Sequence, residues 1–279
     1  MTPLGTVALP SGEHVPALGQ GTWKMAERGS AEEDVTALRL GIDLGMTLID
    51  TAEMYGEGKV ETIVGRAIAG QRDRIFLVSK VYPHNGSRKG VVQACERSLK
   101  RLGTDRLDLY LLHWRGNAAL SETVAGFEDL MRAGKIRFWG VSNFDVDDME
   151  DLFAVPGGAA CATNQILYNL TRRAAEFALI PWLTRRGIPV MAYSPFEQGR
   201  LPKAGALTEI ARRHDAHPYQ IALAWLLRQP HVIAIPKSGQ APHLRDNRAA
   251  AAIVLSDADV AALDAAFRPP RARTPIDML

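Results

Sequence analysis

Four polar side chains with complementary acid–base chemistry stand at or just after short apolar runs of the sequence. Asp50 ends the run LID, Tyr55 follows five residues later, Lys80 ends IFLVSK, and His113 follows LDLYLL. A phenol releases its proton at neutral pH only with help, and a nearby ammonium group helps by stabilising the phenolate. Asp50 would pair with Lys80 and keep it charged, while His113 would donate a hydrogen bond to a substrate oxygen. Together the four residue types predict a proton donor aimed at a carbonyl group.

These residues can act together only if the elements that carry them converge. Short β-rich runs alternate with longer amphipathic segments along the chain. The expected strands lie around ALGQGTW, TLID, IFLVSK, LDLYLLHW, FWGVSN, ATNQ, PVMAYSP and VIAIPKS, eight in all. Helical patterns cover residues 31–45, 59–70, 88–103, 218–229 and 257–267, and glycines at 45, 70, 103 and 134 are placed to end helices.

This alternation predicts the fold class. Strands separated by helical crossovers are parallel, and eight such units favour an α/β protein with a closed (β/α)8 TIM barrel, with an open doubly wound sheet as the alternative. The PSG turn at residues 10–12 predicts an N-terminal β-hairpin, and no Pro/Gly/Ser-rich linker divides the chain, so residues 1–279 are expected to form one domain. Barrel enzymes place their chemistry at the carboxyl ends of the strands. The irregular loop at residues 195–205 is expected to cover a ligand there.

Composition narrows the class of partner. The 279 residues are 47% hydrophobic and 23% charged, and 33 basic against 31 acidic residues leave a net charge of +2 without long runs of one sign. No nucleic acid or membrane surface is therefore expected, and the partner is a small molecule. The sequence shows no secretion signal or membrane span, so we expect a cytoplasmic monomer.

Several other residues are of types that can bind metals or act as nucleophiles. Cys95 and Cys161 lack metal-like spacing and are expected to be structural thiols. His214 and His217 lie where a helix ends and are interpreted as solvent-exposed, so no metal site is predicted. Ser142 and Ser194 lie in VSNF and YSPF rather than in a GxSxG elbow, which argues against acyl transfer.

Seven motifs in order, DTAEMYG, SKVY, LLHW, GKIRFWGVSNF, NQILYN, AYSPF and IPKS, resemble those of the aldo-keto reductases over almost the whole chain. The resemblance implies that Tyr55 is the general acid of carbonyl reduction and that Asp50 and Lys80 form the pair that lowers its pKa. It implies that His113 orients the substrate carbonyl. The reaction would use hydride from the nicotinamide and a proton from Tyr55.

The resemblance also implies NADPH as cofactor, bound without a Rossmann fold, and GQG at residues 19–21 indeed lacks the third glycine of that motif. Tyr193 would stack on the nicotinamide ring, and Ser142, Asn143 and Gln165 would bind its carboxamide. The other implied cofactor contacts are Gly21, Thr22, Trp23, Asp50, Ser194, Pro195, Phe196, Lys237, Ser238, His243 and Asn247.

The adenosine end departs from the family pattern. The segment IPKSGQAPHLRDN, residues 235–247, resembles the one that wraps the adenosine 2′-phosphate, and Lys237, Ser238 and Asn247 match. His243 replaces the usual arginine six residues after the lysine, so it offers stacking rather than a fixed charge, and Arg245 is a candidate to compensate. A preference for NADPH over NADH is still expected.

The substrate pocket is expected to be apolar, and the short segment after the last helix predicts an open site. Its candidate lining residues are Trp23, Met54, Tyr82, Trp114 and Phe196. The motifs look most like a bacterial branch that reduces methylglyoxal and other small reactive or aromatic aldehydes. The alternatives are a keto-sugar reductase of the 2,5-diketo-gluconate type, a Schiff-base aldolase with Lys80 as nucleophile, and a nicotinamide-binding regulatory subunit.

Overall fold

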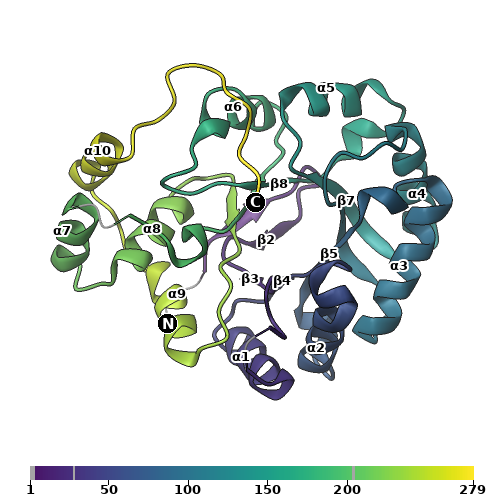
Figure 1. The fold of residues 1–279 in the computed structure, drawn as a ribbon, viewed down its shortest axis with the longest axis horizontal. Coiled ribbons are helices and arrows are strands. Elements are labelled where there is room, and N and C mark those ends of the chain that lie inside the picture. The colour runs from purple at the N-terminus through teal and green to yellow at the C-terminus, as the bar shows by residue number, and fades with distance from the viewer. Residues whose placement is uncertain (1–3, 28, 203–204) are drawn as a thin grey trace.

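The computed structural model describes residues 4–27, 29–202 and 205–279 and has a parallel eight-stranded sheet at its centre (Figure 1). The sheet strands are β3 (Gln20–Gly21), β4 (Leu48–Asp50), β5 (Phe76–Val81), β6 (Leu107–Leu112), β7 (Ile136–Ser142), β8 (Asn164–Leu167), β9 (Val190–Tyr193) and β10 (Val232–Ala234). They are ordered β10-β9-β8-β7-β6-β5-β4-β3, and every neighbouring pair is parallel. All eight strand regions expected from the sequence are therefore confirmed.

The two ends of the sheet meet and close the barrel. Parallel bridges join Leu18 to Ala234 and Gly21 to Lys237. The Gly19 N–H donates to the Ala234 carbonyl at 2.9 Å, and the Gly21 N–H donates to the Pro236 carbonyl at 3.0 Å. A Cβ atom on Gly21 would lie only 2.6 Å from the Ile235 carbonyl oxygen, so glycine permits this closure. The expected (β/α)8 barrel is confirmed.

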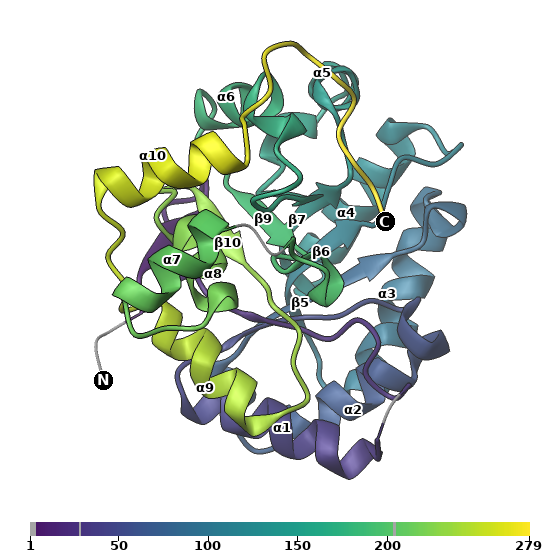
Figure 2. The ribbon, with the colours of Figure 1, turned by 60° about the vertical axis from the view of Figure 1, so that its left-hand side comes forward.

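Helices surround the barrel on the outside (Figure 2). They are α1 (Ala31–Asp43), α2 (Lys59–Ile68), α3 (Arg88–Leu102), α4 (Leu120–Arg132), α5 (Val146–Ala154), α6 (Leu179–Thr184), α7 (Gly205–Arg213), α8 (Pro218–Leu227), α9 (Ala241–Ala250) and α10 (Asp257–Ala266). Ser30 and Ser256 cap α1 and α10 through reciprocal hydrogen bonds with Glu33 and Asp259. Gly103 ends α3 at φ +63°, a conformation that glycine adopts without strain. No helix in the described part of the chain is long and apolar enough to cross a bilayer.

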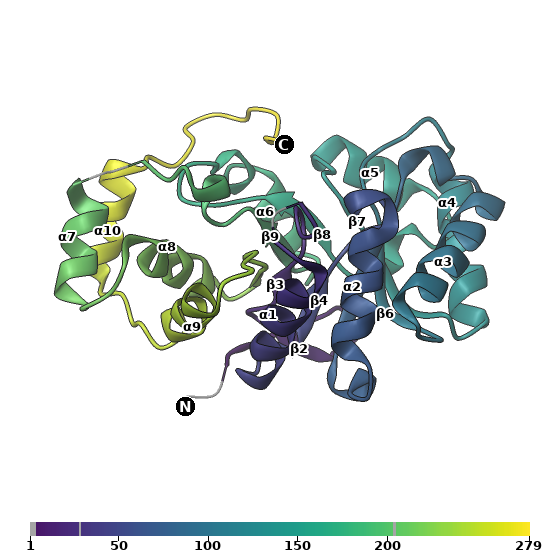
Figure 3. The same cartoon turned by 60° about the horizontal axis from the view of Figure 1, so that its bottom comes forward.

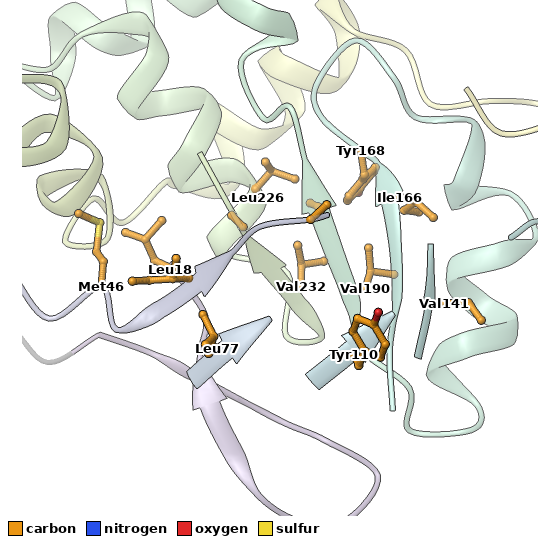
Figure 4. Close-up of a cluster of buried hydrophobic side chains, with 14 of the residues drawn as sticks. Leu18, Met46, Leu77, Tyr110, Val141, Ile166, Tyr168, Val190, Leu226 and Val232 are labelled. Carbon is orange, nitrogen blue, oxygen red and sulfur yellow. The ribbon is translucent and has the colours of Figure 1, made fainter. Parts of the chain in front are cut away.

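Alternating side chains of each strand divide the core into two layers. Outward-facing residues such as Leu77, Tyr110 and Val190 pack against the helices (Figure 4). Inward-facing Leu48, Val78, Leu109, Met191 and Ile233 fill the barrel together with residues of an N-terminal hairpin. The strict alternation of a strand sends every second residue to the inside, so the inward row of each strand ends at the mouth of the barrel.

The hairpin near the start of the described chain and the segment after α10 lie at opposite ends of the barrel. The predicted hairpin is present as β1 (Thr6–Ala8) and β2 (His14–Pro16), and Val7 and Val15 join the inner core from below. The C-terminal segment after α10 crosses back to the other end, where the last residues lie over the barrel centre (Figures 1 and 3). Of the loop expected at residues 195–205, residues 203–204 lie outside the described residues, and Glu197–Gly199 form a short 3-10 helix.

Candidate active site

Lys80 is the hub of the polar residues at the barrel mouth. It faces inward after Phe76 and Val78 on β5 and is completely buried. Its Nζ donates to Asp50 Oδ2 at 2.8 Å, to the Thr51 carbonyl at 2.9 Å and to the Tyr55 hydroxyl at 3.0 Å. An ammonium group has three protons to donate, so all of them are used.

Asp50 is fixed from both sides. One of its carboxylate oxygens accepts from Lys80, and the other accepts from Gln165 Nε2 at 2.8 Å across the barrel. Its backbone carbonyl accepts from the Thr22 hydroxyl at 2.9 Å. Strands β3, β4, β5 and β8 therefore meet in one hydrogen-bonded network, which holds the charged pair in place.

The pKa of Tyr55 differs from the sequence-based expectation, which was that the Asp50–Lys80 pair lowers it. Burial, and then the negative charge of Asp50, raise the pKa of Tyr55 well above its ordinary value. For Lys80, burial lowers the pKa and Asp50 acts in the opposite direction. The phenol is therefore protonated at neutral pH. Because Lys80 donates to its oxygen, the Tyr55 proton is left available to another acceptor.

His113 stands beside Tyr55 on the same wall, with the two ring centroids 5.9 Å apart at an interplanar angle of 72°. Burial and the neighbouring Lys80 charge lower the pKa of His113 to about 2, so its ring is neutral under physiological conditions. Nδ1 is buried and has no hydrogen-bond partner among the described residues. We assign the proton to Nε2, the ring nitrogen that is not enclosed, which makes it a donor toward the cavity.

A cavity of about 1170 Å³ runs from these residues toward α9. Tyr55, His113 and Asp50 line it, whereas Lys80 lies behind its wall. All fifteen residues predicted to contact the cofactor also line it: Gly21, Thr22, Trp23, Asp50, Ser142, Asn143, Gln165, Tyr193, Ser194, Pro195, Phe196, Lys237, Ser238, His243 and Asn247. The shared location of these fifteen residues is compatible with one elongated ligand. The contact of each residue with the cofactor stays a prediction.

The middle of the cavity carries an ordered set of polar groups. The Tyr193 hydroxyl donates to Asn143 Oδ1 at 2.9 Å, and Asn143 Nδ2 donates to the His113 carbonyl at 3.1 Å. The Ser142 hydroxyl donates to the Gln165 carbonyl at 2.9 Å. Gln165 Nε2 donates to Asp50 and contacts Met191 Sδ, and no described residue donates a hydrogen bond to its Oε1. That oxygen is an acceptor available to a ligand.

At the α9 end of the cavity, the described residues include the cation Lys237 and several acidic groups. Lys237 is exposed on the wall and forms no ion pair with any described residue. Arg245 is exposed but does not line the cavity, so its proposed compensation for His243 finds no support in the geometry. Glu33, Asp34 and Asp246 also line this end.

The substrate-side wall differs from the prediction in two ways. Trp23, Met54, Trp114 and Phe196 line the cavity, but Tyr82 stands behind it, with its ring packed on His84 at 4.8 Å and on Trp114 at 5.7 Å. The expected open site is also modified, because the C-terminal residues Met278 and Leu279 lie on the wall. Sequence reasoning had no local signal for this return of the chain.

Glu53 is a further residue that the sequence did not single out, although it lies within DTAEMYG. Its Oε1 accepts from the Tyr82 N–H at 2.9 Å and from Asn85 Nδ2 at 3.0 Å. It thereby joins the loop that carries Tyr55 to the loop after β5. Lys24, from the loop after β3, reaches Gln198 at 3.5 Å, so the β3 and β9 loops meet over the cavity.

The residues considered for other chemistry have structural surroundings. Cys95 and Cys161 are free and buried, and burial raises the pKa of each to about 12. His214 hydrogen-bonds Asp259 at 3.0 Å and is only partly exposed, which corrects the expectation of free solvation. His217 is exposed and caps α8, but it also lines the cavity. Within the described ranges, no group of His, Cys, Asp and Glu could hold a metal ion.

Comparisons with known proteins agree with this geometry. The model of the aldo/keto reductase family matches residues 17–268. The chain is 50% identical over 271 residues to methylglyoxal reductase YeaE of Escherichia coli (strain K12), with 95% of both chains covered. It is 35% identical over 263 residues to glyoxal reductase of Bacillus subtilis (strain 168), covering 93% of this chain and 92% of that protein.

Solved structures agree as well. The structure of an aldo/keto reductase from Klebsiella pneumoniae in complex with NADP and acetate superimposes with a TM-score of 0.96 at 47% identity, covering 99% of this chain and 100% of that one. The barrel and the polar groups at its mouth thus define an oxidoreductase. The chain belongs to the aldo/keto reductase family.

The neutral, buried state of His113 predicts an acid-labile fold. Because its pKa is about 2 when folded and about 6.5 when unfolded, the unfolded chain takes up the extra proton first as the pH falls. The free energy of unfolding should lose about 2 kcal/mol between about pH 7 and about pH 5 from this residue. Urea unfolding of the wild type and of His113→Gln at both pH values measures the loss, which should be smaller in the variant. An equal pH dependence in both proteins would contradict the buried neutral state.

Proposed function

We propose that the chain is an NADPH-dependent reductase of methylglyoxal and other small reactive or aromatic aldehydes. The observation that carries the proposal is the position of Lys80 Nζ, 3.0 Å from the Tyr55 hydroxyl, on a wall where a neutral His113 stands beside Tyr55. The proposal treats residues 1–279 as one catalytic domain that acts as a monomer. We place it in the cytoplasm, where its two buried free cysteines stay reduced.

The residues present fit a nicotinamide cofactor. Gln165 Oε1 and the second lone pair of Asn143 Oδ1 can accept hydrogen bonds beside the partly buried ring of Tyr193. At the other end of the same cavity, Lys237 is a cation without an ion-pair partner among the described residues, and Ser238 lies next to it. A long ligand with a carboxamide at one end and a phosphate at the other suits this order of groups. NADPH, when bound, supplies the hydride for the reduction.

The chain's own residues supply the proton and hold the carbonyl. The Tyr55 phenol is protonated at neutral pH, because burial and Asp50 raise its pKa, and it can donate to an oxygen in the cavity. When it does so, Lys80 is already within hydrogen-bond distance of the phenolate that remains. His113 Nε2 donates to the same oxygen, so charge that develops there meets two fixed donors whose own side chains are buried.

The wall around these donors favours neutral aldehydes over charged sugar acids. Trp23, Met54, Trp114 and Phe196 are apolar or aromatic, and no arginine among the described residues lines the cavity. Lys24 is a cation on this wall, but its Nζ lies 4.5 Å from the centre of the Trp23 ring and hydrogen-bonds Gln198. A keto-sugar acid would bring a carboxylate that needs a cation, whereas methylglyoxal needs little beyond the oxyanion donors. This is why the keto-sugar reductase stays the second candidate. Two relatives also bear the names of methylglyoxal and glyoxal reductase.

The aldolase alternative fails on the position of Lys80. A Schiff-base lysine must expose a neutral amine to its substrate. Lys80 is completely buried behind the cavity wall, and its three protons are donated to Asp50, Thr51 and Tyr55. A purely regulatory role would leave this polar network without a use.

The direct test is the loss of NADPH absorbance with a panel of methylglyoxal, aromatic aldehydes, keto-sugar acids and ketosteroids. The proposal expects the highest kcat/KM with the aldehydes. Efficient turnover of keto-sugar acids alone would favour the second candidate, and tight NADPH binding without turnover would favour the regulatory one.

Tyr55→Phe removes the donated proton while keeping the ring and its packing. We expect kcat for methylglyoxal to fall by at least about a hundredfold, the usual contribution of a positioned general acid. The NADPH Kd, measured by fluorescence titration, should stay close to the wild-type value because the cofactor groups are untouched. Substantial residual kcat would remove Tyr55 from the role of proton donor.

Lys237→Met tests the expected preference for NADPH. Loss of Lys237, which forms no ion pair with a described residue, should raise KM for NADPH by about tenfold, as expected for a charge-assisted hydrogen bond, and leave KM for NADH nearly unchanged. Steady-state kinetics with both cofactors measures the two values. Equal kcat/KM for NADPH and NADH in the wild type would contradict the preference itself.

A further inference from the structure

Arg172, in the loop after β8, contacts two segments that both line the cavity. Its Nη2 and Nε donate to Glu197 Oε1 at 2.9 and 3.2 Å, and its Nη1 donates to Asp277 Oδ1 at 3.1 Å. Glu197 belongs to residues 194–202, called here the β9 loop, and Asp277 belongs to residues 268–279, called here the tail. A guanidinium group is a rigid planar fork, so both carboxylates are placed relative to one body.

A tight turn holds Arg172 in this position. Asn169 is completely buried, and its Oδ1 accepts from the Thr171 N–H at 2.8 Å, the Thr171 hydroxyl at 2.8 Å and the Arg172 N–H at 3.1 Å. Its Nδ2 donates to the Ser194 carbonyl at 2.9 Å and to Glu197 Oε2 at 3.1 Å. Both ends of the Asn169 amide are thus fully used in tying the β8 turn to the β9 loop.

The β9 loop has a backbone that needs such support. Ser194, Glu197 and Gln198 have φ values of +49°, +49° and +57°, in the left-handed region. Each such residue other than glycine costs about 1–2 kcal/mol, and the conformation persists only where neighbouring contacts hold it. Phe196 and Gln198 line the cavity, while the Glu197 side chain is buried and bonded to Arg172. The contact with Arg172 therefore supports the part of the loop that faces the cofactor residues.

The second contact of Arg172 fixes the end of the tail. Asp277 directly precedes Met278 and Leu279, which lie on the cavity wall. Burial raises the pKa of the Tyr193 hydroxyl, and the Leu279 backbone lies close enough to this hydroxyl to oppose part of that rise. Figures 1 and 3 show the tail crossing from α10 to the mouth of the barrel. Farther back, a separate ion pair joins Arg273 to Asp147 at 2.6 Å, away from the cavity wall.

We infer that Arg172 is a positioning residue that couples the aldehyde-side wall to the cofactor-side loop. This inference rests on the proposed function. Through Asp277 it sets the position of Met278 and Leu279, and through Glu197 it sets the β9 loop. Because both segments are held by one guanidinium group, a change of the β9 loop on NADPH binding should also affect the tail.

Four variants separate the two contacts of Arg172. Asp277→Asn removes only the tail contact and should raise KM for an aromatic aldehyde by up to about fivefold, the range of a partly exposed ion pair, without changing the NADPH Kd. Glu197→Gln should raise the NADPH Kd with little effect on that KM. Arg172→Gln should change both, and Arg172→Lys should restore part of each. In all four, kcat should stay within about twofold, because none touches the reacting atoms.

Arg273→Gln is the matched control, since it removes an arginine ion pair of the same tail outside the cavity. Its KM and Kd should equal the wild-type values. If Arg273→Gln raises KM as much as Asp277→Asn does, any ion pair of the tail helps to position it, and the specific role inferred for Arg172 is contradicted. If Arg172→Gln does not fold, the test rests on Asp277→Asn and Glu197→Gln. A wild-type KM for the aldehyde in the first and a wild-type NADPH Kd in the second would overturn the inference.

Limited proteolysis of the tail measures the coupling between the β9 loop and the tail without requiring catalysis. Exposed Arg271 and Arg273 offer trypsin sites in the tail. NADPH should slow their cleavage in the wild type, and this protection should be lost in Arg172→Gln or in the Glu197→Gln and Asp277→Asn pair. Protection unchanged by these substitutions overturns the coupling. A wild type that shows the protection but reduces no aldehyde contradicts the proposed function alone.

Discussion

The buried ion pair between Asp50 and Lys80 is the contact on which the rest of the site depends. Neither side chain has appreciable access to water, and burying two charges is favourable only when their geometry and remaining hydrogen bonds are complete. Here the Thr51 carbonyl, the Tyr55 hydroxyl and Gln165 complete them, and these groups come from the loop after β4 and from strand β8. Breaking such a pair typically costs about 3–5 kcal/mol, because one charge is left uncompensated. Well-packed apolar side chains in place of a pair such as Asp50–Lys80 often leave a protein at least as stable. The charged pair is therefore better explained by its chemical use than by stability.

Burial, reinforced by that pair, sets the protonation states of two neighbouring groups. Burial and then the Lys80 charge keep His113 neutral, while burial and then Asp50 keep Tyr55 protonated. Both therefore present donors to the cavity before any substrate arrives, as a carbonyl reduction requires. The tail that returns from α10 lines part of the cavity wall, and the β9 loop lines another part. Arg172 lies between these two segments and bonds to both, so the wall of the site is one connected structure.

Local patterns were sufficient for the fold and for the position of the catalytic candidates. All eight strand regions were predicted from apolar runs, and the residues at their carboxyl ends converge because parallel strands end at one rim. What failed depends on contacts between distant segments. The direction of the Tyr55 pKa is set by burial that no short motif reports. Tyr82 packs behind Trp114 rather than on the wall, and Met278 and Leu279 reach the cavity from the end of the chain. The fork of Arg172 joins carboxylates 25 and 105 residues away.

The measurement that tests the central claim most directly is the pH profile of kcat/KM for aldehyde reduction in the wild type and in Asp50→Asn. Asp50 opposes the burial that lowers the pKa of Lys80, and it also raises the pKa of Tyr55. Its loss lets both groups give up protons at lower pH. The account predicts that the basic limb of the profile moves to lower pH by about one unit or more, together with a reduced rate. A reduced rate with an unchanged basic limb would contradict the dependence of the Tyr55–Lys80 pair on Asp50.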